Sequence, residues 1–100
     1  MGTLHRDTGE LHGITVVVDT HGPEVWVGRC MEITDAGVVL VDADVHREGE
    51  GGRSKQDYLA RAAKLGVWKK HARVVVPREQ VASVQPLGRL AAPGGGDLPA

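Results

Sequence analysis

The stretch VGRCMEITDAGVVLVDADV, residues 27–45, decides the fold expected for this chain. It spans most of two Val-rich segments, 24–33 and 38–45, that flank the turn sequence Thr-Asp-Ala-Gly at 34–37. Apolar residues that alternate with a period of two are typical of strands. A glycine inside a strand often marks a bulge or a sharp bend, and Gly28 lies inside the first segment. Residues 24–45 are therefore predicted to form a long, bent β-hairpin.

The same sequence signals in the rest of the chain predict three more strands and one helix. A strand is expected over 14–19, and a polar, Gly-rich loop covers 46–53. Further strands are expected over 67–76 and 81–87, separated by one helical turn at 77–80, because Pro77 has no N–H for a ladder. In the third strand, Val39, Val41, Ala43 and Val45 are predicted on one face and Val38, Leu40, Asp42 and Asp44 on the other.

Residues 54–66 carry the signals of a helix inserted between the third and fourth strands. Ser54 is a good N-cap, with Asp57 three residues later, and Gly66 is a good C-terminal stop. The apolar side is expected to consist of Tyr58, Leu59, Ala62 and Ala63, with Arg61 and Lys64 outside.

These elements predict a mainly β protein, a five-stranded, strongly bent, antiparallel SH3-like barrel with one inserted helix. A sandwich would need more strands. The expected organisation is a flexible N-terminus at 1–12, one barrel domain at 13–88, and a disordered Gly/Pro tail at 89–100.

Composition narrows the class of protein. The 100 residues include three aromatic side chains, no Phe and one cysteine, and no apolar run approaches the roughly 20 residues needed to cross a bilayer. Cys30 cannot form an internal disulfide, and the N-terminus has no apolar signal-peptide core. A cytoplasmic protein that does not contact membranes is expected.

The net charge of −1 hides an uneven distribution. Residues 1–52 hold three basic and ten acidic side chains, whereas residues 53–73 hold seven basic side chains and one acidic. This division indicates either a polyanion-binding surface or a contact between acidic and basic regions, within the chain or between subunits.

The segment KKHARVVVP, residues 69–77, lies at the basic end of this distribution. As a strand it would place Lys69, His71 and Arg73 on one face, about 6–7 Å apart. That spacing suits the phosphates of an extended single strand. The alternative is the solvated face of an ordinary sheet, or an edge strand that uses charge to prevent aggregation.

The segments VGRCMEITDAGVVLVDADV and ARVVVPREQVASVQPL (72–87) together resemble the Sm-like family, which includes bacterial Hfq. The resemblance implies a bent five-stranded barrel and homo-oligomeric rings in which the fourth strand of one subunit pairs with the fifth of the next. It also implies RNA binding near the turns after the second and fourth strands. There Asp35 and Arg78 match the family by type and approximate position, while Gly37 stands where Asn is expected. The PRC-barrel family, mainly protein-interaction or processing modules, is a competing resemblance.

Other candidate sites have alternative structural explanations. Trp26 and Trp68 could stack on bases, but in a chain so poor in aromatic residues they are expected to fill the core. Asp42 and Asp44, with Asp35, could attract a hard cation, but the ligand spacing of a Ca²⁺ loop is absent, which favours a solvated strand face.

No catalytic, metal-binding or cofactor motif is recognisable. The five histidines and Cys30 show neither zinc-like spacing nor a nucleophile–base pattern, and GEGG at 49–52 lacks the Lys-Ser/Thr of a phosphate loop. Cys30 is expected to be half-buried and inert. Neither an enzyme nor a cofactor-dependent protein is expected.

Together with the charge distribution, the resemblance to the Sm-like family implies a homo-oligomeric ring that binds RNA or single-stranded nucleic acid. The expected contact residues are Asp35, Lys69, His71, Arg73, Arg78, Arg61 and Lys64, and replacing Lys69 and Arg73 with Ala is expected to flatten the salt dependence of binding. The alternative is a barrel that binds another protein and no nucleic acid.

Overall fold

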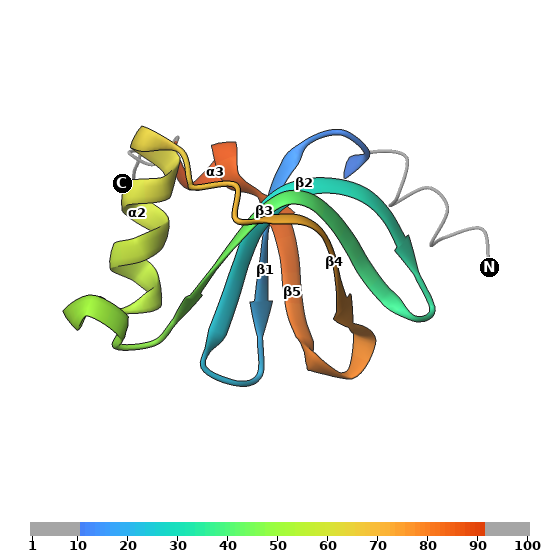
Figure 1. The fold of residues 1–100 in the computed structure, drawn as a ribbon, viewed down its shortest axis with the longest axis horizontal. Helices are drawn as coiled ribbons and strands as arrows, with labels where there is room; N and C mark the ends of the chain where they lie inside the picture. The colour runs from blue at the N-terminus through green and yellow to red at the C-terminus, as the bar shows by residue number, and fades with distance from the viewer. Residues whose placement is uncertain (1–10, 92–100) are drawn as a thin grey trace.

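Five antiparallel strands form one curled sheet in the computed structural model, which describes residues 11–91 (Figure 1). The strands are β1 Thr15–Thr20, β2 Glu24–Thr34, β3 Gly37–Arg47, β4 His71–Pro77 and β5 Val81–Pro86. Their order in the sheet is β4-β3-β2-β1-β5. The predicted strand number, the antiparallel pairing and the long β2–β3 hairpin are confirmed. The two edge strands do not pair with each other, so the sheet is strongly bent but its hydrogen-bonding is not closed.

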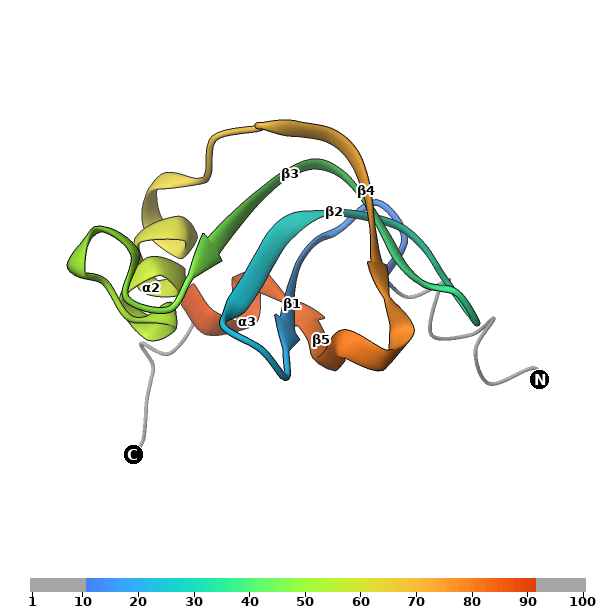
Figure 2. The same ribbon diagram turned by 60° about the horizontal axis from the view of Figure 1, so that its bottom comes forward.

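The bend occurs where Gly28 allows the strands to approach closely. A Cβ at this position would lie 2.8 Å from the Cβ of Ala43 and 3.2 Å from that of Leu40. The β2–β3 register also shifts between Val27 and Arg29 and again between Cys30 and Glu32. Figure 2 shows β2 and β3 arching over β1 and β5, with β4 following the same curve beside β3. The irregularity predicted at Gly28 is confirmed by the register shift, and only a residue without a side chain permits this close approach of β2 and β3.

A backbone irregularity at Asp42 overturns the predicted faces of β3. Asp42 has a φ of 51°, a left-handed conformation that Asp tolerates better than most residues. Before it, the even-numbered Val38 and Leu40 belong to the interior core, but after it the odd-numbered Ala43 does. The alternation therefore reverses at Asp42, and a prediction that assumed an unbroken strand period was wrong.

The sheet has a core on each of its two faces. The interior of the curl is filled by buried residues from four strands: Val16, Val18, Cys30, Val38, Leu40, Ala43 and Val76. On the outer face, Val17, Val25 and Val27 are buried beneath Tyr58, Leu59, Val67 and Leu87. The inserted helix therefore covers the outside of the sheet.

The helix α2, Lys55–Leu65, has the predicted caps. The Ser54 hydroxyl accepts a 3.1 Å hydrogen bond from the Asp57 amide, and Gly66 ends the helix with a φ of 80°. Lys55 holds the first turn against the β1–β2 turn, because its Nζ donates to Asp19 Oδ1 at 2.7 Å and to the Gly22 carbonyl at 2.8 Å. Arg61 and Lys64 are exposed, as predicted.

Two boundaries differ clearly from those expected, and two predicted irregular segments contain 3-10 turns. The fourth strand begins at His71, so residues 67–70 connect α2 to β4 without regular structure. The predicted loop contains the 3-10 turn η1, Glu50–Gly52, and the predicted turn after β4 is η2, Arg78–Gln80. A short helix, α3 Leu87–Ala91, includes the first three residues of the predicted disordered tail. The predictions for 1–10 and 92–100 lie outside the described residues.

Candidate nucleic-acid interface

The turn after β2 and the turn after β4 lie against each other. The Arg78 amide donates a 3.0 Å hydrogen bond to the Ala36 carbonyl, which joins the two turns through the backbone. Nη1 of Arg78 lies 3.7 Å from Oδ1 of Asp35, and both side chains are largely exposed. The two residues that match the Sm-like pattern by type, 43 positions apart in the sequence, therefore form one exposed pair.

Gly37 is required by this junction of turns. Its φ is 147°, and a Cβ on it would lie 2.0 Å from the carbonyl oxygen of Val76. The Thr34 hydroxyl closes the other side of the turn by accepting a 3.1 Å hydrogen bond from the Ala36 amide. An Asn at position 37, where the Sm-like resemblance leads one to expect it, would collide with β4 in this structure.

The Asp35–Arg78 pair is chemically suited to exchange its partner for a ligand. An exposed ion pair contributes only about 0–1 kcal/mol to stability, so little is lost when the two side chains separate. A carboxylate can accept the N–H groups of a base, and a guanidinium can bind phosphate or stack on a ring. The turns themselves, residues 34–37 and 77–80, contain no aromatic residue.

The predicted row of cations on one face of the fourth strand is not present. Lys69 precedes the strand and lines a cavity on the outer face of the sheet together with Arg29 and Asp42. His71 is half-buried, with its ring edge-on to Trp26 at a centroid distance of 5.4 Å. Arg73 is exposed and has no ion-pair partner among the described residues. Of the three predicted contacts, only Arg73 projects freely from β4.

The helix cations lie far from the paired turns. Arg61 and Lys64 are on α2, which stands at the opposite end of the molecule from the β2–β3 turn in both views (Figures 1 and 2). The structure therefore brings together Asp35 and Arg78, leaves Arg73 on a neighbouring strand, and separates Arg61, Lys64 and Lys69 from them. The predicted set therefore does not form a single row on the described part of one chain.

The two tryptophans have different environments. Trp26 packs against the interior core, as predicted. Trp68 is 78% exposed, so the expectation that it fills the core was wrong. That expectation assumed that residue 68 belongs to a strand, whereas it lies in the connection after Gly66.

The acidic residues of β3 do not share a solvated face. Asp44 is buried and accepts a 2.9 Å hydrogen bond from the Tyr58 hydroxyl, whereas Asp42 faces Arg29 at 3.6 Å. Among residues 11–91, no three His, Cys, Asp or Glu side chains gather where they could hold a metal ion. The buried Asp44 could not be recognised from the sequence, because the reversal at Asp42 is what turns it toward α2.

Cys30 is fully buried in the interior core, more completely than expected. Burial raises the pKa of its thiol above the ordinary value, which disfavours the nucleophilic thiolate. None of the helices in the described part of the chain is long and apolar enough to cross a membrane.

No protein-family model and no curated protein matches the sequence, but twelve solved chains match the structure. One is a novel Sm-like archaeal protein from Pyrobaculum aerophilum, with a TM-score of 0.53 and 16% identity; the alignment covers 81% of this chain and 48% of that protein. This chain thus spans about half the length of that relative. Another is the Pyrococcus abyssii Sm protein in complex with a uridine heptamer, with a TM-score of 0.53 and 19% identity, covering 85% of this chain and 93% of that one. The resemblance inferred from the two strand segments is confirmed for the fold: this chain has the Sm-like fold.

Proposed function

We propose that this chain is an RNA-binding protein that assembles through its sheet edges into a homo-oligomeric ring. The contact between Asp35 and Arg78 carries the proposal, because it places a carboxylate and a guanidinium side by side on the two turns where the Sm-like resemblance implies RNA binding. The Sm protein with the same fold was solved with a uridine heptamer, which makes uridine-rich RNA the first ligand to test.

The unpaired edges of the sheet support self-assembly. Among the described strands, β4 pairs with β3 alone and β5 with β1 alone, so each presents one row of free backbone N–H and C=O groups. Such edges promote pairing with another chain. Because the two edges are different surfaces, pairing β4 with β5 of a neighbour is head-to-tail and closes into a ring when the rotation allows. A catalytic activity is not part of this proposal, and the expected cytoplasmic location rests on the sequence alone.

The test is native mass spectrometry of the full chain with and without a uridine-rich RNA. We expect a closed oligomer that gains the mass of the RNA. Arg78→Ala should weaken RNA binding by about 5- to 150-fold, as expected for the loss of a charge-assisted contact of about 1–3 kcal/mol. Arg89→Ala, which removes an exposed arginine of α3, is the matched control and should bind as the parent does.

The other outcomes discriminate between the two functions considered. A closed oligomer that does not bind RNA would support the proposed assembly and contradict the proposed RNA binding. A monomer or dimer that ignores RNA would favour a module that binds other proteins, for which Trp68 and Leu65 offer exposed apolar surface.

A further inference from the structure

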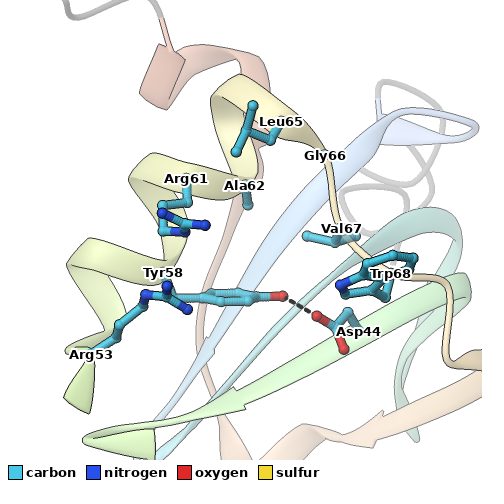
Figure 3. A pocket seen from close by; sticks show the side chains of 9 residues that line it. All are labelled: Asp44, Arg53, Tyr58, Arg61, Ala62, Leu65, Gly66, Val67 and Trp68. Carbon is cyan, nitrogen blue, oxygen red and sulfur yellow. Dashed lines mark hydrogen bonds between the residues drawn. The ribbon is translucent and has the colours of Figure 1, made fainter. Parts of the chain in front are cut away.

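A cavity of about 370 Å³ lies between α2, the end of β3 and the connection that follows Gly66 (Figure 3). The residues that give it chemical character are Asp44, Arg53, Tyr58, Arg61 and Trp68. Its volume falls within the roughly 300–1,000 Å³ typical of small-molecule sites. The helix that forms one wall is the inserted helix, so the cavity is built by the segment that sets this chain apart from a bare five-stranded barrel.

The floor of the cavity holds a buried carboxylate that is only half satisfied. The Asp44 side chain is 7% exposed, and its Oδ2 accepts the hydrogen bond from Tyr58. Its Oδ1 has no hydrogen-bond partner among the described residues. The Lys70 ammonium lies 3.9 Å from that oxygen, but this lysine side chain is 64% exposed. Buried polar atoms are nearly always hydrogen-bonded, so Oδ1, which is itself covered, lacks the partner that such an atom normally has, and a ligand that carries N–H groups would supply it.

The carboxylate is held in place before any ligand arrives. The Tyr58 ring stacks on the buried His46 ring, with a centroid distance of 4.7 Å and an interplanar angle of 6°. Nε2 of His46 lies 3.0 Å from the Arg53 carbonyl, which links this stack to the start of the helix. The acceptor is thus preorganised, which lowers the entropic cost of binding.

The rim offers a flat ring and two cations. Trp68 exposes most of its indole beside Asp44. Arg53 and Arg61 project from the opposite wall, and neither has an ion-pair partner among the described residues. A cationic ligand would be repelled by these arginines, and a plain acidic group by Asp44. A ligand that suits all of them carries N–H donors, an aromatic face and a negative charge.

We propose that this cavity binds a guanine nucleotide, with the base stacked on Trp68, its ring N–H and amino group on Asp44, and its phosphate at Arg53 and Arg61. Guanine presents two adjacent N–H donors, which match the acceptors of a carboxylate. The other bases place an acceptor next to their donor, and a carboxylate repels it. Single-stranded bases are commonly recognised in this way, by stacking and by hydrogen bonds along one edge.

This site is separate from the paired turns, since it lies at the α2 end of the molecule. The nucleotide could be free or part of an RNA strand, and the two sources share the same recognition chemistry. Binding of a mononucleotide does not depend on the proposed RNA function, so the two proposals fail independently.

The test is calorimetric titration of the full chain with GMP, AMP and UMP. We expect GMP to bind at least about tenfold more tightly than AMP and UMP. Asp44→Asn should abolish this preference, because the amide places a donor against the donors of guanine. Trp68→Ala should weaken GMP binding by about fivefold or more, and the substitution leaves the core intact because this side chain is exposed. Arg61→Ala should weaken GMP binding more than Lys64→Ala does. The second variant is the control, because Lys64 is a cation of the same helix that does not line the cavity.

Equal binding of the three nucleotides, no binding of GMP, or an unchanged preference in Asp44→Asn would overturn the proposal. The source of the ligand follows from a second comparison, between a uridine hexamer and the same strand with one central guanine. Tighter binding of the guanine strand that is lost in Trp68→Ala identifies RNA as the source. Equal binding of the two strands, with GMP binding retained, identifies a free nucleotide.

Discussion

The hydroxyl of Tyr58 donates a 2.9 Å hydrogen bond to Oδ2 of Asp44 and thereby joins the inserted helix to β3. Asp44 is buried, and Tyr58 is half-buried and also stacked on His46. Leu59 of α2, Val67 of the connection that follows it and Leu87 of α3 pack against the buried valines of the outer face, and Ala62 of α2 is buried as well. The hydrogen bond supplies the polar part of an otherwise apolar attachment.

Tyr58→Phe removes the only hydrogen bond that the Asp44 carboxylate accepts among the described residues. Leaving a buried acceptor unsatisfied costs about 1–3 kcal/mol, so the free energy of unfolding should fall by that amount in urea denaturation. The matched experiment repeats the substitution in an Asp44→Ala background, where the acceptor is absent and the cost should be much smaller. An equal cost in both backgrounds would show that the hydrogen bond contributes nothing.

The ionisation of Tyr58 should make the protein less stable in alkali. Burial raises the pKa of its hydroxyl, and the hydrogen bond and charge of Asp44 raise it further. In the unfolded chain the hydroxyl ionises near its ordinary pKa of about 10, while in the folded chain it stays protonated to higher pH. The unfolded state therefore loses the proton first, and stability falls as the pH rises above about 10.

Because Tyr58 is the single tyrosine, tyrosinate absorbance reports this group alone. The signal should appear near pH 10 in denaturant and only at higher pH in the native protein. Tyr58→Phe should show a flatter decline of stability over the same range. A native titration that coincides with the denatured one would contradict the burial of this hydroxyl.

Gly37→Ala should destabilise the protein strongly, because the new Cβ would meet the Val76 carbonyl in a conformation that L-residues rarely adopt. Overpacking alone costs about 1–3 kcal/mol, and the backbone strain adds to it. Gly88→Ala is the matched control, since nothing lies within 4 Å of a Cβ there. The free energy of unfolding of both variants is measured by urea denaturation. Equal values for Gly37→Ala and Gly88→Ala would mean that the junction of the two turns is not tightly packed.

The sequence was a good guide to the elements and a poor guide to the direction of individual side chains. The caps at Ser54 and Gly66, the bend at Gly28 and the turn at Pro77 are local signals, and each was read correctly. The direction of Asp44 depends on the left-handed backbone at Asp42, yet VVLVDADV is compatible with an unbroken strand period and gives no sign of the reversal.

The sequence likewise predicted only part of the candidate site. Asp35 and Arg78 could be paired because the family resemblance relates their two turns. Trp68, by contrast, was assigned to a strand that begins three residues later, at His71. Neither its exposure nor the cavity beside it follows from a pattern, since both depend on how α2 packs across the sheet.

Val75→Asp should dissociate the proposed oligomer without unfolding the subunit. Val75 is on the β4 edge and is 38% exposed in the isolated chain, so a charge there is tolerated until a neighbouring strand must cover it. Leu65→Asp, at an exposed apolar residue on α2, is the control and should leave the assembly intact. Native mass spectrometry and circular dichroism would check mass and fold; an unchanged mass for Val75→Asp would exclude this edge from the interface.

Arg73 should account for the whole effect that the sequence assigned jointly to Lys69 and Arg73. Arg73 projects from β4, whereas Lys69 lies in the connection before the strand and lines a cavity with Asp42. Each phosphate contact on a single strand contributes about 0.7 to the slope of log K against log salt. Arg73→Ala should therefore flatten the slope by about 0.7, and Lys69→Ala should leave it unchanged. The measurement is the binding of a uridine-rich RNA to each variant at several salt concentrations. Equal changes of slope in the two variants would support the continuous basic face predicted from the sequence. An unchanged slope in both variants would mean that this strand is an ordinary solvated edge.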